Sequence, residues 1–151
     1  QKMREIIPPL HDAVRKLIPF IDRDTLAFQE YMEARRSPAS TPAEKERRHA
    51  RMQQGLKKAM EVPLEVMRIA YRVWDPLIQA AATVNPASVS DVQVGARCLE
   101  TGIWGACQNV RINLEEVEDS SFREKTLEEA GAILRGSEKK LSEVLEILEK
   151  R

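Results

Sequence analysis

Apolar and polar positions alternate along most of the chain with the spacing of amphipathic helices. Steps of three and four residues keep apolar side chains on one side of a helix, which turns once about every 3.6 residues. Prolines and capping signals divide this pattern into four segments, residues 8–35, 42–82, 89–116 and 121 to near the C-terminus. No segment shows the alternation typical of a strand. The sequence therefore predicts an all-α fold, a bundle of four main long helices that are kinked at prolines.

The first predicted helix carries an apolar row that includes one acid. The row consists of Ile7, Leu10, Val14, Leu17, Ile21, Asp24, Phe28 and Tyr31. We expect these side chains to face the inside of the bundle, and Pro19 to kink the helix because proline has no N–H to donate. Asp22 lies about 200° away from Asp24 around the helix, so it faces elsewhere or marks the edge of the row.

An acid on a buried row has two interpretations. Burial disfavours the ionised form of Asp24, which suits a side chain that donates a proton near neutral pH. Alternatively, a Lys or Arg pairs with Asp24 and makes it a structural residue, because buried carboxylates are usually paired. A side-chain cation within reach of Asp24 would distinguish the second interpretation from the first.

The second predicted helix begins with a capping box at residues 41–44, Thr-Pro-Ala-Glu. Pro63 and Pro76 should bend or interrupt it, and Asp75 with Pro76 offers a cap and first residue for a restart. Its basic start, EKERRHAR at residues 44–51, has acids interleaved with the bases. This pattern favours a solvated face with local ion pairs over a nucleic-acid site.

Two stripes run along the third predicted helix, for which residues 88–91 offer a cap. The first is apolar and consists of Val92, Ala96, Leu99, Ile103, Ala106 and Val110. The second is small and polar and consists of Asp91, Gly95, Cys98, Gly102, Gly105 and Asn109. Each interior glycine costs about 1 kcal/mol of helix stability relative to alanine. We therefore expect a neighbouring helix or a bound ligand to approach the second stripe closely. Asn109 and Asn113, one turn apart, either bind that ligand or hydrogen-bond between helices.

The last predicted helix is expected to be capped by residues 121–124 and to bend at Gly136. Its leucine-rich row suits an outer helix of the bundle or a dimer contact. The whole chain of 151 residues is long enough for one domain with one core.

Composition narrows the class of protein further. The 24 Lys and Arg residues balance the 24 Asp and Glu residues, so no net positive field favours nucleic acid or anionic lipid. No apolar run approaches the roughly 20 residues of a membrane span, and the start lacks a signal-peptide pattern. Cys98 and Cys107 lie about 13 Å apart along one helix, too far to form a disulfide with each other. We expect a cytoplasmic protein with free thiols and, with two histidines, no zinc site.

Five motifs occur in the order and spacing of one family: IDRDTLAF, RRSPASTPAEKERR, VPLE, SDVQVGA and NVRINLEEVED. Through them the whole chain resembles the formimidoyltetrahydrofolate cyclodeaminase family, above all the C-terminal domain of its bifunctional formimidoyltransferase-cyclodeaminases. The resemblance implies a helical domain that dimerises and converts 5-formimidoyltetrahydrofolate into 5,10-methenyltetrahydrofolate with loss of ammonia. Folate is then the substrate, and no separate cofactor or metal is needed. A related branch of the family hydrolyses methenyltetrahydrofolate instead.

The resemblance places the family's proposed proton donor on Asp24 and the preceding acid of its D-x-D pair on Asp22. It also places polar family positions on Asp91, Asn109 and Asn113, and the small stripe suggests that these residues contact folate. Family members carry a P-G-G-G-S loop and a further helix before the first matching residue. We therefore expect residues 1–151 to form one cyclodeaminase-like domain that lacks this segment. The resemblance also allows for a formimidoyltransferase domain in the same protein. The alternatives are a methenyltetrahydrofolate cyclohydrolase and a non-catalytic helical interaction domain.

Overall fold

A computed structural model describes residues 3–151 of the chain. Its helices are α1 (Met3–Leu17), α2 (Phe20–Arg36), α3 (Pro42–Tyr71), α4 (Trp74–Thr83), the short 3₁₀ helix η1 (Pro86–Ser88), α5 (Val89–Leu114) and α6 (Ser120–Glu149). Residues 3–151 contain no strand, which confirms the all-α prediction. None of the helices in this range is both long and apolar enough to cross a membrane.

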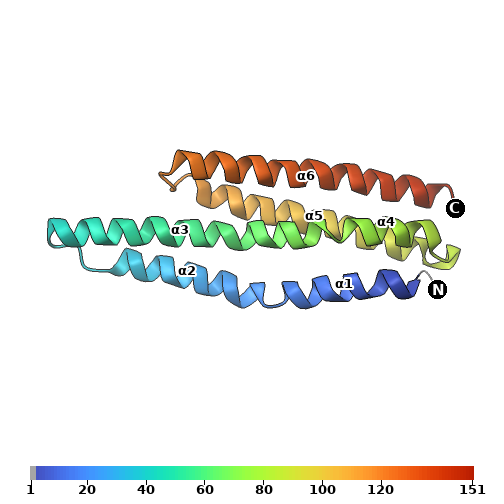
Figure 1. Cartoon of the computed structure of the whole chain (residues 1–151), viewed down its shortest axis with the longest axis horizontal. Coiled ribbons are helices and arrows are strands. Elements are labelled where there is room, and N and C mark those ends of the chain that lie inside the picture. The colour runs from blue at the N-terminus through green and yellow to red at the C-terminus, as the bar shows by residue number, and fades with distance from the viewer. Residues whose placement is uncertain (1–2) are drawn as a thin grey trace.

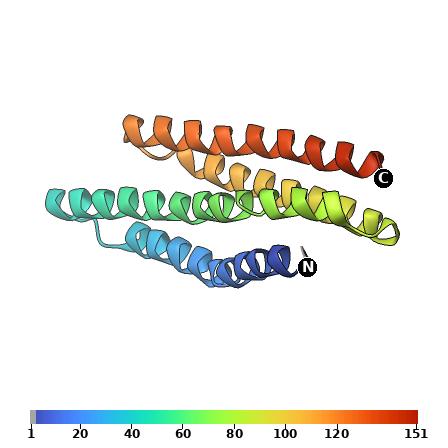
Figure 2. The same ribbon diagram turned by 45° about the vertical axis from the view of Figure 1, so that its right-hand side comes forward.

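The helices form four rods that run up and down the bundle (Figure 1). Helices α1 and α2 follow each other in one rod, and α3 and α4 follow each other in the next. The α3–α4 rod lies between the α1–α2 rod and the pair α5 and α6, and the first and last described residues lie at the same end (Figure 2). The α1–α2 rod therefore covers only one side of the bundle.

Proline determines where the first rod breaks. Pro19 lies between α1 and α2, and the chain turns there with a hydrogen bond of 3.2 Å from the Ile21 N–H to the Ile18 carbonyl. The predicted kink at Pro19 is confirmed as a complete interruption. The predicted start at residue 8 is wrong, since α1 begins at Met3 and contains Pro8 and Pro9. Both prolines are exposed, so water can hydrogen-bond the carbonyls that they leave without an N–H partner.

The predicted capping box of α3 is confirmed. The Glu44 N–H donates to Thr41 Oγ1 at 3.2 Å, and Glu44 Oε2 accepts from the Thr41 N–H at 2.9 Å. Helix α3 continues through Pro63 to Tyr71. The chain then restarts at Trp74 rather than at Pro76, which lies in the first turn of α4.

The predicted cap of α5 lies at the right residue, because Ser88 directly precedes α5, whereas the predicted cap of α6 is wrong by two residues. Ser88 makes no side-chain cap, and the turn before α5 is held instead by Asn85 Oδ1, which accepts from the Ala87 N–H at 3.0 Å. At α6 the cap is Asp119, whose Oδ1 accepts from the Phe122 N–H at 3.0 Å. A carboxylate satisfies this N–H and also interacts favourably with the helix dipole. Helix α6 runs through Gly136 to Glu149 without interruption.

The main core lies between the α3–α4 rod and helices α5 and α6. Its largest fully buried side chains are Trp74, Met60, Met67, Ile103, Val110, Val117, Val144, Cys107 and Ser137. The apolar stripe of the third predicted helix is part of this core, with Ala96, Ile103, Ala106 and Val110 all buried.

The apolar row expected to face inward from α1 and α2 is largely exposed, so this prediction is wrong. Val14, Ile21 and Phe28 are 58%, 71% and 59% exposed. The buried row lies one position earlier and repeats every seven residues: Ile6, Ala13, Phe20, Ala27 and Ala34. Its alanines allow the first rod to pack closely on α3, and a shift of one residue turns a helix by about 100°. Most of the larger row therefore faces outward, although Tyr31 at its end is buried.

Candidate active site

A cavity of about 330 Å³ lies between α2, α3 and α5. Its lining consists of Leu17, Phe20, Ile21, Asp24, Val62, Pro63, Val66, Ala106 and Asn109. Asp24 is the only ionisable side chain in this lining, and Asn109 is the only other polar one. The cavity thus presents one carboxyl group and one amide group from two different helices within an apolar wall.

Asp24 reaches the cavity because of its position in α2. It follows buried Phe20 by four residues, so both side chains lie on the same side of the helix and line the same wall. Asp24 itself is exposed, which corrects the expectation that the bundle of this chain buries it. Its carboxyl group is therefore accessible to a molecule that enters the cavity.

The structural interpretation of Asp24 required a cationic partner. None of the ion pairs among the described residues includes Asp24. The neighbouring Arg23 pairs instead with Glu65 of α3, with 3.0 Å between Nη2 and Oε2. The same guanidinium group lies 4.2 Å from the centre of the Phe20 ring. The geometry thus favours a carboxyl group that is free to act on a ligand.

The two asparagines of α5 have different surroundings. Asn109 lines the cavity. Asn113 is half-buried outside the lining, and its Nδ2 donates to the Asn109 carbonyl oxygen at 3.0 Å. The Asn113 amide is thus used within its own helix, and Asn109 alone presents an amide to the cavity.

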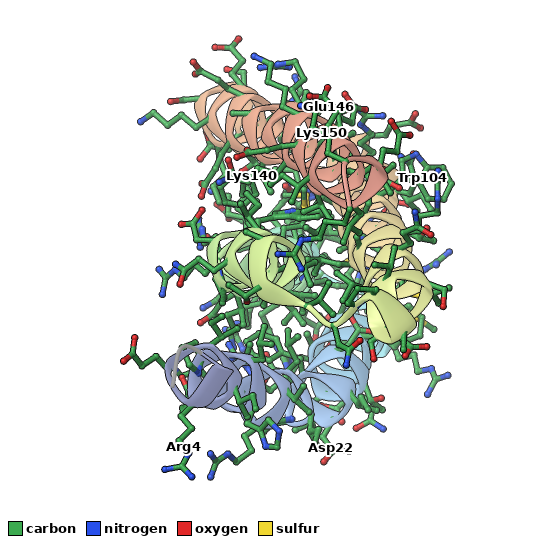
Figure 3. The ribbon with its side chains drawn as sticks, turned by 90° about the vertical axis from the view of Figure 1, so that its right-hand side faces the viewer. Arg4, Asp22, Trp104, Lys140, Glu146 and Lys150 are labelled. Atoms are coloured by element: carbon green, nitrogen blue, oxygen red, sulfur yellow. The ribbon has the colours of Figure 1, made fainter. Side chains whose placement is uncertain are left out.

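Asp22 and Asp91 lie away from the cavity. Asp22 is exposed in the first turn of α2 and points away from the bundle (Figure 3). Asp91 is exposed in the first turn of α5, 18 residues before Asn109. At ~1.5 Å per residue this separation is about 27 Å along the helix. Within one copy of the chain, the structure brings together Asp24 and Asn109 but neither Asp22 nor Asp91.

The glycine stripe of α5 is not covered by the described part of the chain. A Cβ atom added at Gly95, Gly102 or Gly105 would meet nothing within 4 Å. The expectation that a helix or pocket wall covers these glycines is therefore wrong for a single copy of residues 3–151. Nearby on α5, Val94, Trp104 and Ile112 are also exposed, and Trp104 projects outward from the bundle (Figure 3).

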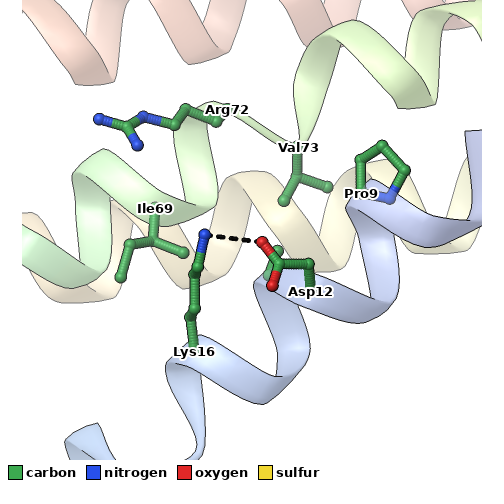
Figure 4. Close-up of a pocket in the computed structure, with 7 residues that line it drawn as sticks. Pro9, Asp12, Lys16, Ile69, Arg72 and Val73 are labelled. Carbon is green, nitrogen blue, oxygen red and sulfur yellow. Dashed lines mark ion pairs between the residues drawn. The ribbon is translucent and has the colours of Figure 1, made fainter.

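A second cavity, of about 200 Å³, lies between α1 and the junction of α3 and α4 (Figure 4). It contains none of the predicted site residues. Lys16 Nζ lies 2.6 Å from Asp12 Oδ2, so the one acid in its lining is paired. Within residues 3–151, no three His, Cys, Asp or Glu side chains gather as a metal site. The cavity at Asp24 is therefore the better candidate for chemistry.

Sequence reasoning missed the apolar wall of the site. Phe20, Val62 and Pro63 form much of it, and all three are buried. Two signals in the sequence could have indicated them. Phe20 belongs to the seven-residue repeat of buried positions, and Val62 and Pro63 belong to the VPLE motif.

These features define an all-α domain with a candidate ligand site between helices, which is a common location for such sites in helical bundles. The sequence matches the model of the formiminotransferase-cyclodeaminase family over residues 1–132. The chain therefore belongs to this family.

Individual relatives agree with this assignment. The formimidoyltransferase-cyclodeaminase of Gallus gallus is 44% identical over 149 residues, which cover 99% of this chain and 28% of that protein. The methenyltetrahydrofolate cyclohydrolase of Methylorubrum extorquens is 30% identical over 132 residues, which cover 87% of this chain and 64% of that protein. The crystal structure of formiminotetrahydrofolate cyclodeaminase from Thermotoga maritima matches with a TM-score of 0.83 and 28% identity, over 98% of this chain and 70% of that chain.

Proposed function

We propose that this domain cyclises 5-formimidoyltetrahydrofolate to 5,10-methenyltetrahydrofolate and releases ammonia, a step of histidine degradation. The observation that carries the proposal is that Asp24 and Asn109 line the same apolar cavity, whose described lining contains no other ionisable side chain. Membership of the family and the names of the relatives support the same activity. Folate itself is the substrate, so the reaction needs no separate cofactor.

The reaction makes one bond and breaks another. N10 of the folate attacks the carbon of the protonated formimidoyl group on N5. The C=N π electrons move to the formimidoyl nitrogen, and the new C–N10 bond gives a tetrahedral carbon that carries an amino group. N10 loses its proton, the amino group gains one, and the C–N bond to the amino group breaks to release ammonia. The lone pair of N5 then completes the methenyl cation. The chemical difficulty is the amino group, because an amine leaves poorly unless it is protonated.

Asp24 is proposed as the acid that protonates this amino group and as the base that collects the proton from N10. A folate that fills the cavity would cover the exposed carboxyl group and displace water from it. Loss of water favours the neutral form of the carboxyl group, which is the form that can donate a proton. Proton transfer by a positioned group contributes about 10²–10⁴-fold to a rate. The apolar wall would add a proximity effect by holding N10 close to the reacting carbon.

Asn109 is proposed to orient the substrate. Its amide lines the same cavity as Asp24 and can donate to and accept from polar atoms of a pterin ring. Asp22, Asp91 and Asn113 stay predictions as folate contacts, because they lie outside this cavity in a single chain.

Turnover of 5-formimidoyltetrahydrofolate by the natural polypeptide that contains this chain tests the proposal. The absorbance of methenyltetrahydrofolate should rise as ammonia is released in equal amounts. Ammonia release without methenyltetrahydrofolate, or no turnover of a substrate that binds, would contradict the proposed function.

The second candidate is the hydrolysis of methenyltetrahydrofolate. The 30% sequence identity to the Methylorubrum extorquens cyclohydrolase supports this second activity as a candidate. The same absorbance should then fall when methenyltetrahydrofolate is supplied. The ratio of the two rates decides which reaction the domain carries out.

We further propose that the domain forms a homodimer through α5. The exposed small stripe of this helix is symmetric about the level of Glu100. Cys98 and Gly102 lie two positions on either side of this level, Gly95 and Gly105 lie five, and Asp91 and Asn109 lie nine. Two antiparallel copies of α5 can therefore pair small residue against small residue. This pairing would also bring Asp91 of one copy close to Asn109 of the other.

Sedimentation of the natural polypeptide tests the dimer. Gly102→Leu should dissociate it, because the added side chain prevents close approach of two helices while a single copy has room for it. Lys139→Leu on the exposed surface of α6 is the matched control and should leave the dimer intact. An unchanged sedimentation coefficient in Gly102→Leu would contradict pairing through α5.

Two further predictions accompany this function. Cys98 and Cys107 are both free thiols, which supports a cytoplasmic location. The chain spans 28% of the Gallus gallus relative, whose name includes a formimidoyltransferase. A transferase domain in the same protein is the partner that we propose on this basis.

A further inference from the structure

The residue directly before Asp24 is an arginine that the structure holds outside the cavity. Arg23 is absent from the lining around Asp24 and borders a separate groove with Glu61 and Val62. Its guanidinium group lies 4.2 Å from the centre of the Phe20 ring, while Phe20 also lines the Asp24 cavity. The cation is therefore close to the site without being part of it.

Glu65 is the residue that fixes Arg23 in this position. Arg23 Nη2 donates to Glu65 Oε2 at 3.0 Å, which links α2 to α3. The two side chains are 49% and 41% exposed, and ion pairs with such exposure contribute little to stability. The contribution of this pair to the free energy of unfolding is therefore small. The position of the pair beside the cavity suggests a role in the site.

An unrestrained arginine at this position would interfere with proton donation by Asp24. Side chains of neighbouring residues on a helix point about 100° apart and do not face each other, so only a long side chain such as that of arginine can reach the next residue. A cation within about 4–6 Å of a carboxyl group favours its ionised form. Asp24 would then keep its negative charge and lack the proton that the departing amine requires.

We propose that Glu65 is a positioning residue of the Asp24 site: it holds the Arg23 guanidinium group beside the Phe20 ring and so prevents it from pairing with Asp24. The inference rests on the proposed function of Asp24. The other charged groups that border the groove at Arg23 are already paired. Glu61 Oε2 lies 3.6 Å from Arg68 Nη1. Lys58 Nζ lies 2.6 Å from Glu30 Oε2, and Lys57 Nζ lies 2.6 Å from Asp119 Oδ2. Among the described residues neither Asp24 nor Asp22, the two acids on either side of Arg23 in the chain, makes an ion pair, so both are available partners for a released Arg23.

Four versions of the natural polypeptide test this inference: the unaltered protein, Glu65→Gln, Arg23→Gln and the double variant. Glu65→Gln keeps the size of the side chain but frees the arginine. We expect its kcat to fall about 10-fold, the effect of one new ion pair on the proton donor, with KM within about 3-fold. Arg23→Gln should keep kcat within about 2-fold, because it removes the cation itself. The double variant should regain kcat within about 3-fold of the unaltered protein.

A purely structural role gives a different pattern. If the pair only connects α2 to α3, Arg23→Gln and Glu65→Gln should lower kcat equally, and the double variant should be no better than either. That pattern would overturn the inference, as would an unchanged kcat in Glu65→Gln. Glu30→Gln is the matched control, because it breaks another exposed ion pair between α2 and α3, to Lys58, and should leave kcat unchanged.

A measurement without turnover separates this inference from the proposed function. The ¹³C resonance of the Asp24 carboxyl group should shift on Arg23→Gln only when Glu65→Gln is also present. A shift on Arg23→Gln alone, or no shift in either background, would contradict the inference. If the unaltered protein lacks turnover, the proposed function fails, and the carboxyl resonance still decides whether Glu65 keeps Arg23 from Asp24.

Discussion

Trp74 and Ser137 meet in the centre of the core, where indole Nε1 of Trp74 donates a hydrogen bond of 3.0 Å to Oγ of Ser137. Both side chains are fully buried. Ser137→Ala would leave the indole N–H without a partner, and an unpaired buried donor costs about 1–3 kcal/mol. We expect the free energy of unfolding, measured by urea denaturation, to fall by this amount. Ser142→Ala on the exposed side of α6 is the control, and equal effects of the two changes would contradict the assigned role.

The glycines of the two last helices should respond in opposite ways to alanine. A Cβ atom at Gly136 would lie 2.6 Å from the Tyr71 hydroxyl oxygen and 3.0 Å from its ring. Gly136→Ala should therefore lower the free energy of unfolding by about 1–3 kcal/mol through overpacking.

Gly102→Ala meets nothing within 4 Å in a single copy of the chain. It should raise the stability of the monomer by about 0.5–1 kcal/mol, since glycine is a poor helix former. Thermal melts at a protein concentration low enough to keep the chain monomeric compare the two variants. A loss of monomer stability in Gly102→Ala would show that something in the chain packs on this stripe.

An ion pair between α3 and α6 should make stability depend on pH. Arg68 Nε and Nη2 donate to the two carboxylate oxygens of Glu129 at 2.6 and 2.8 Å. These hydrogen bonds lower the pKa of Glu129 below its ordinary value of 4.5. A carboxyl group whose pKa is lower in the folded state stabilises the fold above its unfolded pKa, and this contribution disappears as the pH falls through the folded pKa.

Arg68→Gln should therefore be less stable than the unaltered protein at pH 7 and approach it as the pH falls below 4.5. The side chains are 35% and 42% exposed, so solvent screening limits the difference to about 1 kcal/mol. Urea denaturation at several pH values measures it. A difference that stays constant down to strongly acidic pH would contradict the contribution of Glu129.

The sequence was sufficient for the fold class and for most of the helix bounds. Signals within a few residues decide these features, such as the Thr41–Glu44 capping box and the interruption at Pro19. The sequence did not indicate which side of α1 and α2 packs against the core. Two apolar rows one residue apart compete there, and close packing of Ala27 and Ala34 on α3 outweighs the larger side chains of the outer row.

The site shows the same division between local and tertiary information. Asp24 stands out in the sequence as an acid among apolar residues, and it does line an apolar cavity. That Asn109 rather than Asn113 accompanies it depends on how α5 is rotated against α3. The ion pair of Arg23 with Glu65 joins residues 42 positions apart, so no local pattern indicates it.

Asp24 is proposed to supply the proton that the departing amino group requires. Asp24→Asn keeps the size and much of the hydrogen bonding of the side chain but removes this proton. We expect kcat for 5-formimidoyltetrahydrofolate to fall by about 100-fold or more with folate affinity within severalfold, as for an interaction made mainly in the transition state. Asp22→Asn, at an exposed acid that points away from the bundle, should have a much smaller effect.

Turnover of the Asp24→Asn variant, followed by the absorbance of methenyltetrahydrofolate alongside a melting curve, is the most direct test of this role of Asp24. We expect a folded protein with its melting temperature preserved and kcat reduced about 100-fold. Near-normal turnover in a folded Asp24→Asn variant would contradict this role.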